Sequence, residues 1–170
     1  MSKIKLSILL LTSFFIFNCT KNQINYFNQK YSLSYIGGEY DGLLLKNYLI
    51  NSLKKLNIYD QKSNYEIQAN IGHGSNLFIT NIDNTSDREK ITSDLSIRIF
   101  DNISNCVIYS DIFNVSQFYV YASSDKFLSN QIATRKIKKD NTEALVKNFI
   151  NKLKNVENEC KESRNPNITN

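Results

Sequence analysis

The chain has 170 residues, of which 41% are hydrophobic and 22% are charged. These shares are those of an ordinary globular protein, so they exclude a chain that is disordered throughout, and the length leaves room for one folded domain. The net charge of +5 includes Lys3 and Lys5 at the start of the chain; the remainder has 19 basic and 16 acidic residues. That excess is too small for a nucleic-acid-binding surface, so we expect no nucleic acid partner.

The N-terminus has the pattern of an export signal. Two lysines precede the apolar run Leu6–Phe17, which is too short to span a bilayer as a helix. The run ends at Ile16-Phe17-Asn18-Cys19, which resembles a lipoprotein signal, with an aliphatic residue three positions before the cysteine that receives a diacylglyceryl group. Asn18 departs from the small residue usual at that position. The pattern predicts a signal peptide over residues 1–18.

Cleavage before Cys19 would make this cysteine the new N-terminus, and two or three acyl chains would hold it firmly to a membrane. An uncleaved anchor helix and an ordinary secretory signal that contains a cysteine are the alternatives. Residues 19–29 are mostly polar and are interpreted as a lipidated tether. In Gram-negative lipoproteins an aspartate after the cysteine retains the protein in the inner membrane. Thr20 therefore favours the periplasmic side of the outer membrane.

The folded domain is predicted over residues 30–156, beginning with a strand and a helix. Alternating side chains over 31–35 predict a half-buried strand, which Gly37-Gly38 should end. From Asp41 to Leu56, apolar residues recur at spacings of three and four, which predicts an amphipathic helix with Asp41 as its N-cap.

Three strands are predicted next. The first covers Tyr65–Asn70 and continues over Leu77–Thr80 after a break at Gly72-His73-Gly74, so that the two pieces would form one bulged strand. A polar turn over 81–88 leads to a strand over Ile91–Asp101. Cys106–Tyr109 then leads into Ile112–Tyr121, which should pair with the preceding strand as an antiparallel hairpin.

Helical spacing returns between Asp125 and Val156. Asp140 and Glu143 resemble a capping box, so the helix is expected to restart there. The segment 157–170 is polar and is predicted to be disordered. The expected fold is an α+β two-layer sandwich, with two helices packed on one face of a four-stranded sheet.

A search for catalytic or metal-binding patterns finds none. The single histidine, His73, has no Cys or His at a spacing suited to metal binding, and the glycines around it lack the rest of a phosphate-binding motif. Asp83, Asp87 and Glu89 match no calcium loop and are interpreted as a solvated turn. The sequence therefore predicts no enzyme activity, no metal and no cofactor.

Two other features are candidates for a role. An oxidising compartment would allow Cys106 and Cys160 to pair, although the sequence leaves open whether they do. A basic patch in the last predicted helix could contact lipid phosphates, although such a patch is more often a solvated surface; it consists of Arg135, Lys136, Lys138 and Lys139.

The whole arrangement resembles the lipopolysaccharide-assembly lipoprotein LptE family, especially its alphaproteobacterial forms. The resemblance covers residues 15–155, from the lipoprotein leader through a strand, a helix, three strands and a closing helix. It is most specific over Thr92–Lys154, where the strand Asp94–Ile99 precedes a tyrosine-rich segment, Phe118–Ser124, at the start of the last helix. This last helix lacks the arginine- and alanine-rich composition common in the family.

The resemblance implies a protein that is not an enzyme. It would sit inside the outer-membrane barrel LptD, assist assembly of that barrel and help deliver lipopolysaccharide to the cell surface. The alternative is an auxiliary lipoprotein of an ABC-type lipid-transport system, similar to the PqiC-like group. A lipoprotein enzyme and a receptor-like or cell-wall-binding lipoprotein remain further alternatives, because a small sandwich supports many roles.

Overall fold

The computed structural model describes residues 29–79, 87–120, 126–156 and 160. Within these ranges the elements follow in the order strand, helix, three strands, helix. Their bounds are β1 Tyr31–Gly37, α2 Glu39–Lys55, β2 Tyr65–Ile79, β3 Asp87–Asp101, β4 Cys106–Val120 and α3 Phe127–Leu153. The leader, Cys19 and most of the predicted tether and tail lie outside the described residues.

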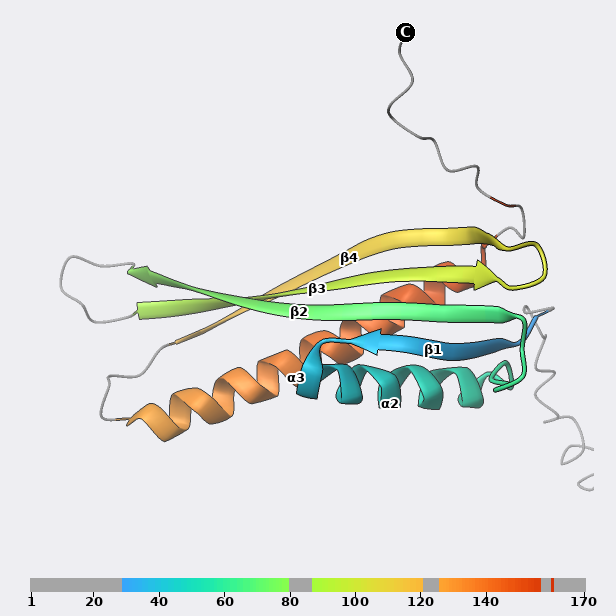
Figure 1. Ribbon diagram of the computed structural model, residues 1–170. Coiled ribbons are helices and arrows are strands. Elements are labelled where there is room, and N and C mark those ends of the chain that lie inside the picture. Colours follow the sequence, from blue (N-terminus) through green and yellow to red (C-terminus); the bar gives the residue numbers. More distant parts are fainter. Residues whose placement is uncertain (1–28, 80–86, 121–125, 157–159, 161–170) are drawn as a thin grey trace, which may run out of the picture.

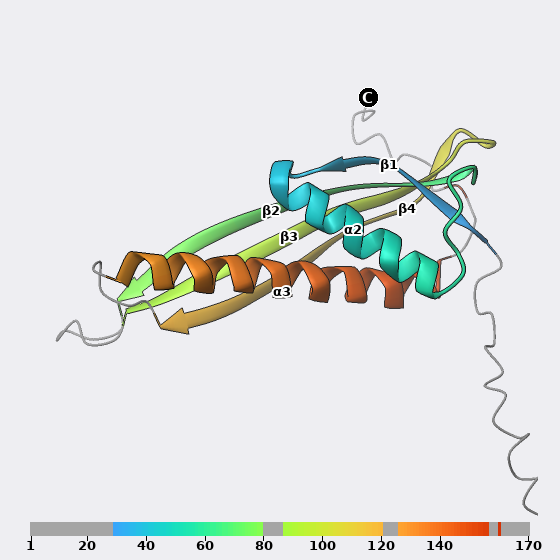
Figure 2. The same cartoon turned by 90° about the horizontal axis from the view of Figure 1, so that it is seen from below.

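The four strands form one sheet in the order β1-β2-β3-β4. β1 and β2 are parallel, because α2 connects the end of β1 to the start of β2, whereas the other two pairs are antiparallel. Both helices lie on the same face of this sheet (Figure 1). Seen from the helix side, α2 crosses the part of the sheet that contains β1, and α3 runs along β3 and β4 (Figure 2). The predicted α+β two-layer sandwich is therefore confirmed.

The first helix begins earlier than the sequence suggested. Gly38 is its N-cap, with a φ of 111°, and α2 starts at Glu39, so the prediction of Asp41 as the cap is wrong. A Cβ at Gly38 would lie 2.6 Å from the Ile71 carbonyl oxygen, so only glycine fits this tight turn. The amide of Gly42 donates to the Gly38 carbonyl over 3.0 Å. Asp41 thus occupies the first turn, and its carboxylate is available for other contacts.

β2 is one continuous strand, as the sequence suggested, but the predicted break and bulge at Gly72-His73-Gly74 are wrong. Its register with β3 runs without a shift from Tyr65 opposite Asp101 to Ile79 opposite Asp87. The two glycines pair in this register with Asp94 and Thr92, and a Cβ at either would meet no atom within 4 Å, so no close contact requires glycine there. The predicted turn over 81–88 was also too long, because β3 already begins at Asp87.

β4 joins the two predicted pieces, Cys106–Tyr109 and Ile112–Tyr121, into one strand paired antiparallel with β3, as the sequence suggested. The register shifts where Ile99 pairs with Tyr109 and Phe100 pairs with Val107, which leaves Ile108 as an extra residue. Because of this bulge, Ile108 and its neighbour Tyr109 are both buried.

α3 is one uninterrupted helix, so the predicted restart at Asp140 is wrong. The Thr142 hydroxyl donates to the carbonyl of Lys138 over 2.8 Å inside the helix, and the Asn141 side chain is buried against the sheet. Asp140 and Glu143, which resemble a capping box, therefore lie in the middle of α3 and not at a helix start.

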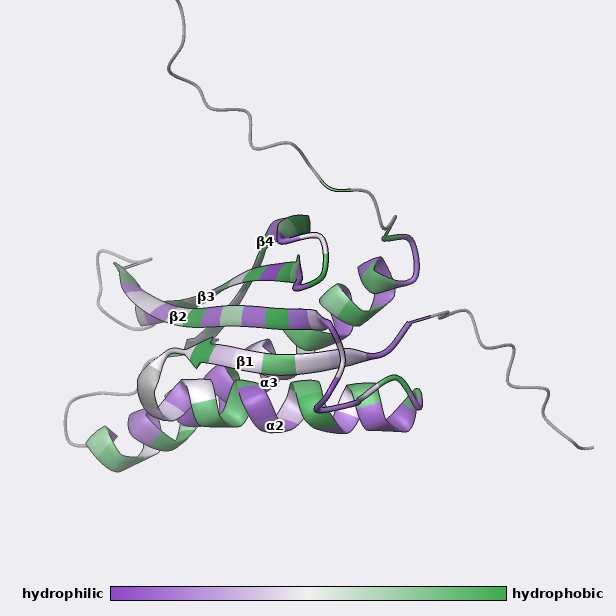
Figure 3. Cartoon of the chain, turned by 45° about the vertical axis from the view of Figure 1, so that its right-hand side comes forward, coloured by the Kyte–Doolittle hydropathy of each residue, from purple (hydrophilic) through white to green (hydrophobic). Residues whose placement is uncertain are grey.

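The core lies between the sheet and the helices, where alternate strand residues meet the apolar stripes of α2 and α3. This alternation is visible along β2 and β3 as bands of opposite hydropathy (Figure 3). The side chains with no exposed surface include Leu45, Leu49, Ile67, Leu95 and Phe149. β2, β3, β4 and α3 continue beyond the N-terminal end of α2, so one half of the sandwich is covered by α3 alone (Figures 1 and 2).

Candidate functional site

A groove between α2 and α3 contains three members of the predicted basic patch. Arg135, Lys138 and Lys139 line it, whereas Lys136 is exposed on α3 outside it. The structure therefore divides the patch into a groove-lining set and one residue that points elsewhere. The groove encloses about 760 Å³, within the range of small-molecule sites.

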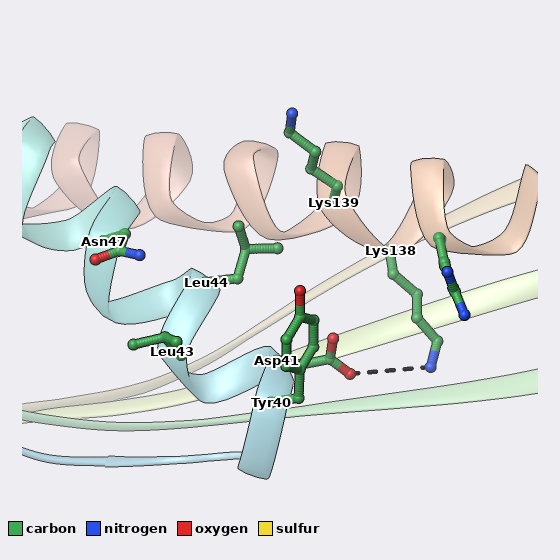
Figure 4. A pocket seen from close by; sticks show the side chains of 8 residues that line it. Tyr40, Asp41, Leu43, Leu44, Asn47, Lys138 and Lys139 are labelled. Carbon is green, nitrogen blue, oxygen red and sulfur yellow. Dashed lines mark ion pairs between the residues drawn. The ribbon is translucent and has the colours of Figure 1, made fainter. Parts of the chain in front are cut away.

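The two walls of this groove differ in chemistry. The first turns of α2 supply Tyr40, Leu43 and Leu44, of which Tyr40 is 84% exposed and Leu43 is 58% exposed. The opposite wall, on α3, carries the three cations. Lys138 points across the groove toward Asp41 of α2, with 3.9 Å between Nζ and Oδ2 (Figure 4). An ion pair this long and this exposed contributes little stability, so Lys138 remains available to another anion.

A buried polar network lies against the groove. The side chain of His73 is only 2% exposed, and its Nδ1 is 2.7 Å from the hydroxyl of Ser93, which lies directly opposite in the β2–β3 ladder. Asn141 of α3 donates from Nδ2 to the same hydroxyl oxygen over 2.9 Å. Among the described residues the other ring nitrogen, Nε2, has no hydrogen-bond partner, and it lies 3.7 Å from Asp41 Oδ2. Asp41 therefore links the groove to this network.

The hydrogen bonds favour a neutral imidazole at His73. Because Asn141 donates to the Ser93 oxygen, the Ser93 hydroxyl can donate its own proton to Nδ1. Burial lowers the pKa of His73, and the charge of Lys138 acts in the same direction, whereas Asp41 and Asp94 oppose this shift. These residue types resemble a hydrolase triad, but Ser93 has no exposed surface, so its hydroxyl is inaccessible to a substrate.

We call the sheet face opposite the helices the open face. Its central part is mostly polar, but Ile112 is 72% exposed there, and Phe78, Phe118 and Val120 make its far end apolar. Its side chains come from alternate positions of β2, β3 and β4, including Glu66, Gln68, Asn70, Asp94, Ser96, Arg98, Ser110, Asn114 and Ser116. Arg98 donates from Nε to Gln68 over 2.7 Å, and Gln68 donates to Glu66 over 3.0 Å. Hydrogen bonds from Ser34, Gln68 and Asn102 lower the pKa of Glu66. The central part of the open face is therefore a hydrogen-bonded array of charged and uncharged polar groups.

The end of the sandwich beyond α2 carries exposed apolar side chains, and we call it the distal tip. Its members are Leu77, Phe78, Phe118, Val120, Phe127, Leu128 and Ile132, each more than two-fifths exposed. The Phe78 and Phe118 rings lie 5.8 Å apart, and Lys90 Nζ is 5.7 Å from the centre of the Phe118 ring. A concentration of exposed apolar groups of this kind is typical of an interaction surface.

Cys106 and Cys160 form a disulfide, with 5.7 Å between their Cα atoms. The bond ties the segment after α3 to the start of β4, so the chain remains attached to the domain beyond the last helix. Cys19, the predicted lipidation site, lies outside the described residues, as do Tyr121 and Ser124 of the tyrosine-rich segment.

No group of three or more His, Cys, Asp or Glu side chains in the described part of the chain could hold a metal ion. No helix in the same part is both long enough and apolar enough to cross a bilayer.

The sequence pattern identified the cations of the groove but not its other wall or the network beneath it. For His73 the sequence showed only that no Cys or His lies at a spacing suited to metal binding. Its partner, Ser93, is 20 residues away, and only the β2–β3 register places the two side chains together. If β2 had been predicted as one strand and paired with β3 across the 81–86 connection, the register would have placed His73 opposite Ser93.

The fold is shared with solved bacterial lipoproteins. A minor lipoprotein from Acinetobacter baumannii matches with a TM-score of 0.56 at 12% identity, covering 75% of this chain and 91% of that one. The rare lipoprotein B from Shewanella oneidensis matches with a TM-score of 0.53 at 9% identity, covering 75% of this chain and 98% of that one. No protein-family model matches the sequence, and no curated protein matches it significantly. At these identities the comparisons show a common fold.

Proposed function

We propose that this chain is an outer-membrane lipoprotein, acylated at Cys19, that pairs with an LptD-like barrel in lipopolysaccharide assembly and transport to the cell surface. The lipoprotein signal supports the anchor, and a fold shared with the minor lipoprotein and rare lipoprotein B supports membership of this class of proteins. In this role the protein acts through binding surfaces and has no catalytic site.

The observation that carries the proposal is the polar central part of the open face. The lumen of a wide outer-membrane barrel is polar, so a protein held within it needs a surface that forms hydrogen bonds, not an apolar one. Arg98, Gln68 and Glu66 form such a surface, and both described helices lie on the opposite side of the sheet. The array extends over the central parts of β2, β3 and β4 and offers many partners to the inward-facing side chains of a barrel.

The test is photo-crosslinking in living cells, with a photoreactive residue placed on different sides of the domain. Ser96 samples the open face, Ser75 samples the part of β2 beyond α2, and Lys147 samples the exposed side of α3. A protein enclosed in a barrel should give adducts to the same large outer-membrane protein from all three positions.

A different pattern would favour the alternative role. An auxiliary lipoprotein of a periplasmic lipid shuttle meets its partner through one patch and leaves the other sides in water. Adducts to a periplasmic transport protein from one position, with no barrel adduct from any, would contradict the proposal and support a PqiC-like function.

The proposal also assigns lipopolysaccharide as a ligand of the basic patch. Changing Arg135, Lys136, Lys138 and Lys139 together to glutamine should weaken binding to lipopolysaccharide micelles, most strongly at low ionic strength, because salt screens exposed charges. Unchanged binding at low salt would mean that the patch is only a solvated surface.

A further inference from the structure

The groove between α2 and α3 is amphipathic across its width. Its α2 wall presents Leu43, 58% exposed, together with Tyr40 and Leu44. These side chains are separate from Leu45, Leu49 and Leu53, which are buried and pack the helix against the sheet. Exposed leucine and tyrosine side chains that face a groove offer contacts to an alkyl chain. The opposite wall presents Arg135, Lys138 and Lys139.

The charge balance of the groove favours an anion. Against three cations there is one carboxylate among the lining side chains, that of Asp41. Lys138 is 3.9 Å from this carboxylate, and both side chains are about one-third exposed, so the pair is weak and easily exchanged. An incoming anion could thus take over Lys138 without breaking a strong interaction.

Two further features lie beside Asp41. α2 begins here at Gly38 without a side-chain cap, so the positive end of a 17-residue helix points toward this region. The buried ring of His73 presents Nε2, which has no hydrogen-bond partner among the described residues, 3.7 Å from Asp41 Oδ2. An unsatisfied polar atom with almost no exposed surface is costly, and a polar group bound beside Asp41 could satisfy it directly or through water.

We propose that this groove binds one acyl chain of an anionic lipid, with the phosphate of its head group held by Arg135 and Lys138, with Lys139 adding positive charge to the same wall, and with its chain lying along Tyr40, Leu43 and Leu44. The inference deepens the lipid contact of the proposed function and rests on it for the choice of lipid. It differs from simple charge attraction because it assigns a definite place to the chain and excludes Lys136 from the site.

The experiment uses a dodecyl phosphate with a photoreactive diazirine in its alkyl chain. The full acylated chain is placed in phosphatidylcholine nanodiscs, the probe is added, and mass spectrometry maps the labelled residues after irradiation. Labelling should concentrate on residues 40–47 of α2. A dodecyl maltoside probe with the same diazirine has a neutral head and should label these residues far less.

Two triple variants on α3 separate the groove from general surface charge. The first changes Arg135, Lys138 and Lys139 to glutamine; the matched control changes Lys136, Lys147 and Lys152, all exposed on the same helix, to glutamine. The groove variant should lower α2 labelling roughly tenfold, which corresponds to a loss of about 1.4 kcal/mol in binding free energy. The control should label like the wild type, and D41N, which removes the only carboxylate among the lining residues, should increase labelling.

Competition identifies the source of the phosphate. Displacement of the probe by lipid A or by phosphatidylglycerol would support the proposal and show which lipid is preferred. Equal displacement by inorganic phosphate would overturn it, because the chain would then contribute nothing.

Other outcomes also overturn the inference. These are equal losses in the two triple variants, equal labelling by the neutral probe, or labelling centred on Phe118 and Phe127 of the distal tip. Circular dichroism of each variant verifies its folding. Barrel capture in the crosslinking experiment above does not depend on the alkyl chain, so failure of the groove would leave the pairing proposal standing.

Discussion

Leu49 provides a quantitative test of the packing between α2 and the sheet. Its side chain has no exposed surface and belongs to the core cluster that includes Ile67, Leu95 and Phe149. Truncating a fully buried leucine to alanine costs about 2–5 kcal/mol, from lost burial and from the cavity left behind. The total stability of a domain of this size is roughly 5–15 kcal/mol, so L49A should remain folded but be clearly weakened.

The loss should be visible in urea denaturation. With an m-value of about 1.5–2 kcal/mol per molar, a loss of about 3 kcal/mol lowers the midpoint by roughly 1.5–2 M. L49D adds an unpaired carboxylate between helix and sheet and should abolish the folded state. The controls are L43A and L43D on the same helix, since Leu43 is 58% exposed and each change should cost less than about 0.5 kcal/mol. Circular dichroism suits the assay because the chain has no tryptophan. A native spectrum and midpoint for L49D would refute this packing.

Three further predictions follow from individual residues. C19S should abolish incorporation of radiolabelled palmitate; unchanged labelling would rule out the lipoprotein interpretation. C106S should lower the free energy of unfolding by about 4 kcal/mol, which is the loop entropy expected for two cysteines 54 residues apart. The reduced wild type should have the same melting temperature as the variant. Equal stability of the reduced and oxidised wild type would contradict this prediction. The pKa of His73 in the folded protein lies below its ordinary value of 6.5, so the unfolded chain binds the proton first as the pH falls. The free energy of unfolding should therefore decrease from about pH 7.5 to pH 5.5. H73Q should flatten this dependence. An equally steep profile in H73Q would exclude His73 as the cause, since it is the only histidine.

Local pattern was sufficient for most of the fold. The alternation at Leu95, Ile97 and Ile99 and the spacing of Leu45, Leu49 and Leu53 reflect burial on one side of an element, and burial is what the two-layer arrangement requires. The errors lie at element ends and interruptions, where the competing contacts are distant in sequence. At Gly38, the N-cap of α2, a Cβ would collide with the Ile71 carbonyl oxygen. In the middle of α3, the Asn141 side chain donates a hydrogen bond to the Ser93 hydroxyl of the sheet.

The same distinction applies to the candidate site: residues on one helix were predictable, and those that depend on a second element were not. The cations of the groove form a recognisable run on one helix, so the sequence identified Arg135, Lys138 and Lys139. It could not separate Lys136 from them, because the position of the second helix decides which side chains face the groove. Of the apolar wall on α2, only Leu44 belonged to the predicted apolar stripe. Tyr40 and Leu43 were not singled out, because spacing alone does not show that exposed apolar side chains beside the stripe line a groove.

The groove, the distal tip and the open face occupy different parts of the domain. The groove lies where α2 begins, about halfway along the sheet, and α3 leads from it to the distal tip, with Arg135 and Lys138 also lining a second hollow beside Phe127 and Tyr119. Cations at the junction of two hollows can hold a phosphate while the attached chain lies on either side. The open face is on the other side of the sheet, so contacts made through it do not involve the side chains that line the groove. In the proposed function, a lipid in the groove and a barrel contact on the open face can therefore be present at the same time.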